Sequence, residues 1–134
     1  MSEGIIKISD AATLALHAMV ILAKSQDRLV SVKEIATSLD VSANHLSKVM
    51  QRLNKAGLIE SIKGYNGGFK LIKKQEDITF LKIYELFDGK LQNSTCLLSQ
   101  KKCTGDCVLG GLVESVNRQV KEKFQKTKLS DFID

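Results

Sequence analysis

Apolar positions near the start of the chain predict two helices separated by a short turn. Ser9 has a side chain of the N-cap type, and residues 10–25 are apolar on almost every side, which predicts a helix buried on most faces. Ser31 and Glu34 have the Ser-x-x-Glu spacing of a capping box, in which the hydroxyl and the carboxylate each accept a bond from a free backbone N–H. A short helix over residues 32–38 is therefore expected.

The next segment predicts a third helix with one apolar and one polar face. Ser42 has a side chain that commonly caps a helix start, and Gly57 suits the end, where a positive φ is favoured. The apolar side chains recur at i, i+3, i+4 and i+7, as Leu46, Val49, Met50 and Leu53. The polar side chains of the opposite face are Asn44, His45, Ser47, Lys48, Gln51, Arg52 and Lys55.

Residues 58–72 have the pattern of a β-hairpin. Two short β-type runs, residues 58–62 and 69–72, flank the Gly-rich and basic stretch of residues 63–68. Two short helices joined by a tight turn and followed by a hairpin are the order of elements in a winged helix-turn-helix. We therefore expect a mostly α fold with a small β-hairpin wing. The absence of Pro agrees with a helical fold rather than a turn-rich sandwich.

Beyond the hairpin, the pattern predicts two further helices separated by a loop. Thr79 caps the first of them, and Asp88 with Gly89 closes it. The second is a long amphipathic helix over residues 108–126, with apolar positions at Leu109, Leu112, Val113, Val116, Val120 and Phe124. This stripe exceeds what one small domain would cover, which favours a dimer interface; packing on the first helix is the alternative. We therefore expect a winged helix-turn-helix DNA-binding domain over residues 1–89, a cysteine-bearing sensor loop over 90–107, and a dimerisation helix with a C-terminal tail over 108–134.

The positive charge of the chain is concentrated in one segment. The net charge is +5. Residues 41–74 carry 7 Lys and Arg side chains against one acidic residue, Glu60, whereas residues 76–134 carry 9 basic and 9 acidic residues. A basic segment of this kind favours contact with a polyanion, most simply nucleic acid; a solvated face with additional lysines is the alternative. Aromatic residues make up only 5% of the chain, which disfavours a stacking platform for single-stranded nucleic acid.

The polar face of the third helix suits recognition of double-stranded DNA. An α-helix fits the major groove, where Asn44 and Gln51 can pair with adenine, and Lys48 and Arg52 with guanine or phosphate. Ser42, beside the free N–H groups of the helix start, suits a backbone phosphate. Glycines in the hairpin let the backbone approach the sugar–phosphate closely. The candidate DNA-binding residues are Ser42, Asn44, His45, Lys48, Gln51, Arg52, Lys63, Tyr65 and Asn66.

The three cysteines, Cys96, Cys103 and Cys107, lie within twelve residues. An odd number argues against a disulfide framework, and the C-x6-C-x3-C spacing differs from the paired C-x2-C of zinc ribbons. Lys101 and Lys102 favour the thiolate form, which ligates metals or reacts with oxidants. Three thiolates and one further ligand suit an iron–sulfur cluster. A thiol-based redox switch without metal, a zinc site and inert cysteines are the alternatives.

Four motifs of the chain carry a family resemblance. They are Val-Lys-Glu-Ile-Ala at 32–36, Val-Ser at 41–42 with Leu46, Leu-Asn-Lys-Ala-Gly-Leu-Ile at 53–59, and Lys-Gly-Tyr-Asn-Gly-Gly-Phe-Lys-Leu at 63–71. Together they resemble the IscR/NsrR/CymR family of bacterial winged-helix regulators, from about Ile6 to Asp134 and including the three-cysteine loop. Where the family's wing has an arginine before Gly-x-x-Gly-Gly, this chain has Lys63.

The resemblance implies a homodimer that binds double-stranded DNA at a pseudo-palindromic operator, with residues 108–126 in the dimer interface. It also implies a [2Fe–2S] or [4Fe–4S] cluster on Cys96, Cys103 and Cys107, whose loss alters DNA binding. The candidates for a fourth ligand are Glu3, Asp10 and Asp106.

Membrane and enzyme functions are not indicated by the sequence. No apolar stretch approaches the roughly 18–20 residues of a membrane span, and the first residues lack the basic start of a signal peptide, so we expect a soluble, cytoplasmic protein. His17 lies on an almost wholly apolar helix, where we expect a core residue, and His45 lies on the polar face of the third helix. No phosphate loop, nucleotide fingerprint or zincin motif occurs, so we do not expect an enzyme.

The expected function is that of a homodimeric DNA-binding transcription regulator, acting as a repressor. Its three-cysteine loop would bind an iron–sulfur cluster and sense iron–sulfur status, nitric oxide or redox state. The alternative is a winged-helix regulator without a cluster, which uses a cysteine thiol switch or a small-molecule or protein effector. If Arg52 reads a base, Arg52→Ala should weaken operator binding by roughly 1–3 kcal/mol, and if Lys63 contacts only phosphate, Lys63→Ala should weaken binding to all sequences alike.

Overall fold

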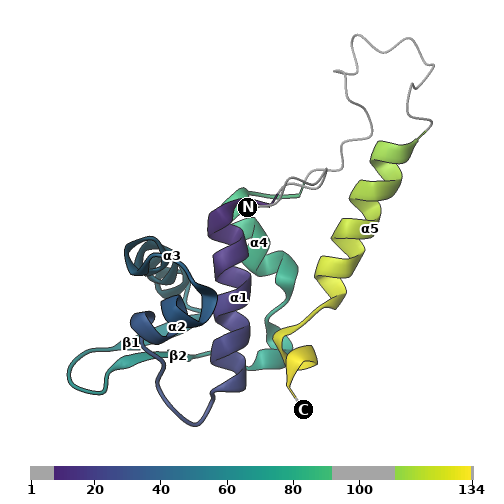
Figure 1. Ribbon diagram of the computed structural model, residues 1–134. Coiled ribbons are helices and arrows are strands. Elements are labelled where there is room, and N and C mark those ends of the chain that lie inside the picture. Colours follow the sequence, from purple (N-terminus) through teal and green to yellow (C-terminus); the bar gives the residue numbers. More distant parts are fainter. Residues whose placement is uncertain (1–7, 92–110, 134) are drawn as a thin grey trace.

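The computed structural model describes residues 8–91 and 111–133, and its elements follow the predicted order (Figure 1). The helices are α1 (Asp10–Lys24), α2 (Val32–Leu39), α3 (Ala43–Lys55), α4 (Phe80–Asp88) and α5 (Leu112–Lys126). Strands β1 (Ile59–Ile62) and β2 (Gly68–Leu71) form an antiparallel hairpin, and the 3-10 turns are η1 (Gln75–Asp77) and η3 (Leu129–Phe132). The predicted mostly helical fold with a small β-hairpin is confirmed.

Helices α1 to α4 each begin at a hydroxyl side chain that the sequence marks as a cap. The backbone N–H groups of Ala12, Glu34, His45 and Lys82 donate to the hydroxyls of Ser9, Ser31, Ser42 and Thr79 over 3.1, 3.1, 3.3 and 3.2 Å, respectively. These bonds satisfy donors that the first turn of a helix leaves free, and each typically stabilises a helix by about 1 kcal/mol.

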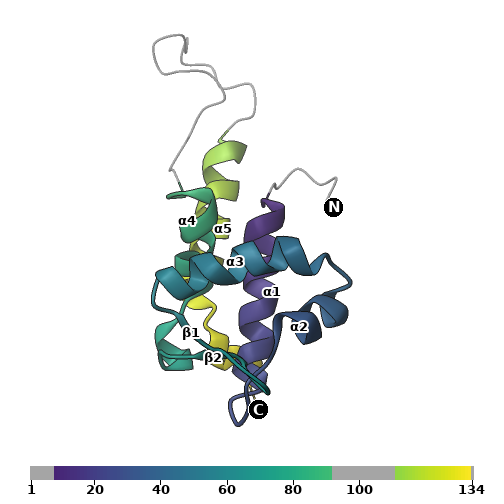
Figure 2. The same ribbon diagram turned by 90° about the vertical axis from the view of Figure 1, so that its left-hand side faces the viewer.

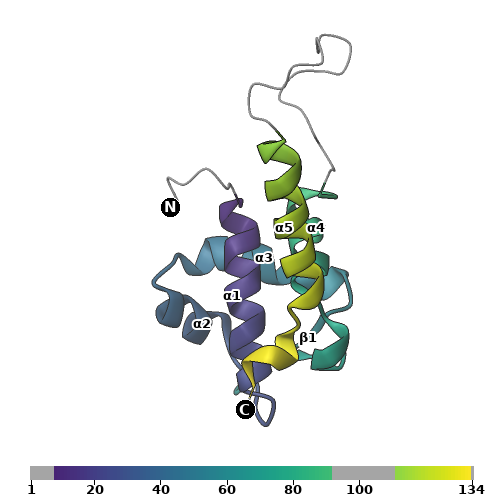
Figure 3. The ribbon, with the colours of Figure 1, turned by 90° about the vertical axis from the view of Figure 1, so that its right-hand side faces the viewer.

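Helix α1 runs through the middle of the molecule and supplies much of the core (Figures 1 and 3). Its buried side chains include Leu14, Met19 and Leu22, and it packs against α3, α4 and η3. The expectation that His17 is a core residue is wrong. His17 is exposed, and its Nδ1 lies 2.7 Å from the carbonyl oxygen of Thr13. The reason is that α1 is buried on most sides but keeps one open stripe, along which residues at seven-residue intervals face solvent.

The wing, which is the hairpin of β1 and β2, is joined to the helix-turn-helix by backbone hydrogen bonds to the segment before α2. In the hairpin, Ile59 pairs with Leu71 and Ile62 with Gly68. Val30, which precedes α2, forms an antiparallel bridge to Phe69, with N–H···O distances of 3.1 and 2.8 Å in the two directions. This bridge fixes the loop-proximal end of β2 beside the start of α2.

The C-terminal segment fastens α5 to the rest of the molecule at one end. Leu129 is fully buried, and its N–H donates to the Ile78 carbonyl at 3.1 Å, while the Phe80 N–H donates to the Thr127 carbonyl at 2.9 Å. Helix α5 packs against α4, where the rings of Tyr84 and Phe124 have centroids 5.5 Å apart. From this anchored end α5 extends away from the core (Figure 1). The segment 108–110 of the predicted helix lies outside the described residues.

Among the residues that the structure describes, no helix is long and apolar enough to cross a membrane.

Candidate nucleic-acid interface

Helix α3 presents its polar face to solvent on the side of the molecule from which the wing projects. Figure 2 shows α3 crossing the front of the molecule, and Figure 1 shows the wing extending on that same side. Leu46, Met50 and Leu53 of α3 are fully buried, which fixes the rotation of the helix. The predicted contact residues Ser42, Asn44, His45, Lys48 and Gln51 are all exposed. Helix α3 is therefore oriented with its predicted reading face outward.

The spacing of the polar side chains on α3 places them along one edge. Asn44, Lys48 and Gln51 lie at i, i+4 and i+7, so their side chains are neighbours over two turns of helix. A B-DNA major groove about 12 Å wide accepts a single helix of this kind. The edge offers two amides, which can each donate and accept hydrogen bonds, with one ammonium group between them.

The wing tip presents three further predicted contact residues. Lys63, Tyr65 and Asn66 are exposed, and Tyr65 is 98% exposed. Asn66 has a φ of +64° and Gly64 a φ of +105°, and the Gly67 N–H donates to the Gly64 carbonyl at 3.0 Å to close the turn. The tip therefore projects an aromatic ring and an amine from a compact turn.

The ion pairs of the described residues leave most basic groups of this face unneutralised. These pairs join Arg28 to Glu34 and Lys70 to Glu60, the second at 3.8 Å. Lys48 and Lys63 have no carboxylate partner within residues 8–91 and 111–133, so their charges remain available to an anionic ligand. Of the basic residues in 41–74, Lys48, Arg52 and Lys55 lie on α3, Lys63 and Lys70 lie on the hairpin, and Lys73 and Lys74 follow β2.

The structure assigns Arg52 a different partner from the one expected. Its Nη2 donates to the carbonyl oxygen of Leu86 at 2.6 Å, and its guanidinium lies 4.5 Å from the centroid of the Phe87 ring. Both partners belong to the last turn of α4. The Arg52 guanidinium therefore contacts the end of α4, while Arg52 as a whole remains exposed to solvent.

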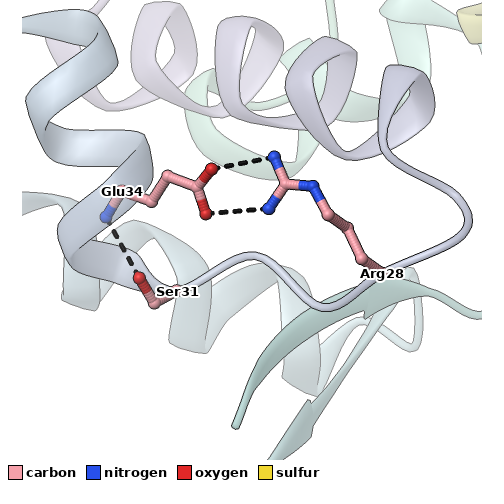
Figure 4. Close-up of polar contacts among 3 residues, drawn as sticks. All are labelled: Arg28, Ser31 and Glu34. Carbon is pink, nitrogen blue, oxygen red and sulfur yellow. Dashed lines mark hydrogen bonds and ion pairs between the residues drawn. The ribbon is translucent and has the colours of Figure 1, made fainter. Parts of the chain in front are cut away.

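Sequence reasoning missed a bidentate ion pair at the start of α2 (Figure 4). Arg28 Nη1 and Nη2 donate to the two carboxylate oxygens of Glu34 at 3.0 and 2.8 Å. These hydrogen bonds, with the opposite charges, raise the pKa of Arg28 and lower the pKa of Glu34. Ser31 caps α2 as expected, but the Glu34 carboxylate pairs with Arg28 instead of completing the capping box, because a charged bidentate partner binds more strongly than a neutral N–H.

The Arg28–Glu34 pair also lines an open cleft beside the wing. Arg28, Ser31 and Glu34 form one wall, and Gly64, Asn66 and Gly67 of the wing tip form the other. Arg28 lies six residues before Glu34 and outside α2, so no helical spacing in the sequence indicated this pair.

The candidate cluster ligands fall largely outside the described residues. Cys96, Cys103 and Cys107 lie there, as do Glu3 and Asp106. The fourth-ligand candidate Asp10 is exposed in the first turn of α1, next to Ser9, whose N–H and hydroxyl both donate to the Asp88 carboxylate of α4. Within the described ranges, no group of three His, Cys, Asp or Glu side chains is placed to hold a metal ion.

Comparison with known proteins places the chain in a family. Residues 8–134 match the Rrf2 family, described as an iron-dependent transcriptional regulator. A relative from Aquifex aeolicus (strain VF5), named as an HTH-type transcriptional regulator, is 37% identical over 129 residues, which cover 93% of this chain and 90% of that protein. The HTH-type transcriptional regulator NsrR of Halalkalibacterium halodurans is 40% identical over 84 residues, covering 63% of this chain and 56% of the relative.

Solved structures agree with this assignment. CymR, the global cysteine regulator of B. subtilis, has a TM-score of 0.81 at 28% identity, with 95% of each chain covered. IscR of T. potens has a TM-score of 0.71 at 26% identity, covering 94% of this chain and 85% of that one. The exposed polar face of α3, the basic wing and these similarities lead to one conclusion: the chain belongs to the Rrf2 family and is a winged-helix, DNA-binding transcription regulator rather than an enzyme.

Proposed function

We propose that this regulator binds a pseudo-palindromic operator in double-stranded DNA as a homodimeric repressor. The observation that carries the proposal is the exposure of the α3 polar edge on the same side as the basic wing. Helix α3 lies in the major groove, and the wing approaches the adjacent minor groove. The residues proposed to contact DNA are Ser42, Asn44, His45, Lys48, Gln51, Lys63, Tyr65 and Asn66.

The proposed dimer forms through α5. No residue of α5 is fully buried, although Val113, Val116 and Val120 form an apolar stripe, and Leu112 at its start is 54% exposed. Within the described residues these valines are only partly buried, and Phe124 near the C-terminal end of the stripe packs on the aromatic rings of α4. A second copy of α5 packed along this stripe would bury the remaining apolar surface and place two α3 helices on one duplex.

We further propose that Cys96, Cys103 and Cys107 hold an iron–sulfur cluster through which the regulator senses iron–sulfur status, nitric oxide or redox state. The donor set supports this, because three thiolates beside two lysines favour a soft-metal centre that one further ligand completes. The description of the matching family, an iron-dependent transcriptional regulator, points in the same direction. A bound cluster would supply a centre that oxidants and nitric oxide can alter, and the chain would supply its thiolates and the fourth ligand.

A thiol switch or a small-molecule effector is the second candidate for the sensing function. The structural similarity to CymR, named as a global cysteine regulator, favours it. An oxidized form of CymR from Staphylococcus aureus also resembles this chain, with a TM-score of 0.75 at 26% identity. In this case the cysteine thiolates would react with an oxidant directly, or an effector would bind elsewhere on the chain.

Iron and sulfide analysis of protein purified without oxygen separates the two candidates. We expect the wild type to contain iron and sulfide in matched amounts and to absorb visible light, and Cys103→Ser to lose most of both, because a thiolate ligand is missing. Ser99→Ala in the same segment is the matched control and should keep the wild-type content. An iron-free wild type that resists anaerobic reconstitution would refute the cluster and leave the thiol switch or effector site.

A further inference from the structure

We infer that Arg52 is a positioning residue, which ties the recognition helix α3 to the last turn of α4 and sets the orientation in which α3 meets DNA. This inference rests on the proposed DNA-binding function. Arg52 lies near the C-terminal end of α3, one residue after the proposed contact residue Gln51. It acts on DNA through the placement of α3 and makes no base contact itself.

The chemistry of the contact explains why an arginine is needed. The Leu86 carbonyl is one of the last four of α4, which have no partner within the helix. Arg52 Nη2 donates to this oxygen at 2.6 Å, and its positive charge lies at the negative end of the helix dipole. The planar guanidinium also lies over the Phe87 ring, with its central carbon 4.5 Å from the ring centroid. One side chain therefore uses both its donor and its flat face.

The last turn of α4 is itself held by contacts other than the one with Arg52. The Asp88 carboxylate accepts from the Ser9 N–H at 3.0 Å and from the Ser9 hydroxyl, which ties this turn to the start of α1. The Glu85 carboxylate accepts from the Leu91 N–H at 3.0 Å, which closes the chain after α4. The turn therefore joins the start of α1 to the end of α3. A shift of this turn would move α3 through Arg52.

The buried stripe of α3 does not make the Arg52 contact redundant. Leu46, Met50 and Leu53 fix one side of α3 in the core. Apolar packing is non-directional, so it tolerates a small tilt of the helix better than a hydrogen bond of fixed geometry does. The Arg52 contact adds a directional restraint near the C-terminal end of α3, beside the residues that we propose contact DNA.

A double-mutant cycle on DNA affinity tests this inference. The duplex is a site that wild-type protein selects from a random pool, and the variants are Arg52→Ala, Phe87→Leu and the two combined. We expect Arg52→Ala to weaken binding about tenfold and Phe87→Leu about threefold. The combined variant should bind no more weakly than Arg52→Ala, because both changes remove the same contact. Phe87→Leu keeps an apolar side chain at this half-buried position, and thermal unfolding verifies that each variant is folded.

Salt dependence distinguishes positioning from direct contact. Affinity for DNA falls with salt concentration, and removing a side chain that contacts a phosphate makes the slope of log affinity against log salt shallower by about one. Because Arg52 is inferred to make no phosphate contact, Arg52→Ala should leave this slope unchanged. Lys48→Ala is the comparison variant, for which the slope should become shallower. Arg52→Lys, which keeps the charge but lacks the fork and the flat face, should bind more weakly than wild type with an unchanged slope.

Two results together would overturn the inference and make Arg52 a DNA contact. They are a salt slope that becomes shallower by about one in Arg52→Ala, and additive effects of Arg52→Ala and Phe87→Leu on DNA affinity. Those results would leave the proposed function intact. Failure of the wild type to select any sequence would instead refute the proposed function itself.

Discussion

Replacing Gly68 with alanine is expected to detach the wing from the helix-turn-helix and to weaken DNA binding by at least about tenfold. A Cβ at this position would lie 2.7 Å from the Val30 carbonyl oxygen, 2.8 Å from its carbonyl carbon and 3.1 Å from the Ser31 nitrogen. All three are backbone atoms, so no side-chain rotation relieves the clash. Val30 must move, which breaks its paired hydrogen bonds with Phe69. Overpacking of this kind typically destabilises a protein by about 1–3 kcal/mol.

Urea unfolding and binding to the selected duplex measure the Gly68→Ala effect. Gly64→Ala is the control in the same hairpin, because its Cβ would meet nothing within 4 Å and only its φ of +105° would be strained. Gly64→Ala should therefore cost about 1–2 kcal/mol in strain and leave the Val30–Phe69 bridge in place. Wild-type stability and affinity for Gly68→Ala would show that the wing is not fixed as the structure describes.

Val116→Glu is expected to convert the dimer to a monomer and to weaken operator binding by at least about 100-fold. Val116 lies at the centre of the half-exposed apolar stripe of α5. A carboxylate there would be buried without a partner in the proposed interface, and two copies would face each other across the two-fold axis. A monomer contacts only one half-site and loses the gain from linking two binding modules, which is commonly about 10²–10⁴-fold.

Sedimentation and DNA binding with a matched control test the Val116→Glu prediction. Gln125→Glu adds the same charge to an exposed position on the opposite side of α5 from Val116. This variant should therefore remain dimeric and bind as wild type does. Dimeric Val116→Glu protein with wild-type operator affinity would place the dimer interface on another surface.

The elements of the fold were predictable because their signals are local. Caps at Ser31, Ser42 and Thr79 lie within three residues of the N–H groups they accept from, so the sequence alone identifies the helix starts. The stripe of α3 repeats within two turns, and its buried positions coincide with the fully or nearly fully buried residues of the structure. The outward face of α3 followed directly from that stripe, which is why five of the proposed DNA-contact residues are exposed as expected.

The features that sequence reasoning missed depend on partners distant in sequence or on small differences between the faces of a helix. Arg52 lies 34 residues before its acceptor Leu86, and no sequence pattern links the two. Glu34 takes the charged partner Arg28 in place of a backbone N–H, a competition that spacing cannot decide. His17 is exposed because α1 leaves one narrow stripe open, and a helix that is apolar nearly all round gives a weak indication of where that stripe lies.

Selection of bound sequences from a random pool of double-stranded DNA tests the central claim most directly. Two α3 helices related by the two-fold axis of a dimer should select an inverted repeat, with half-sites separated by about one helical turn or a multiple of it. The wild type is therefore predicted to enrich such a repeat, and Val116→Glu to enrich no repeat. Enrichment of no sequence by the wild type, or of a single site without two-fold symmetry, would contradict the account.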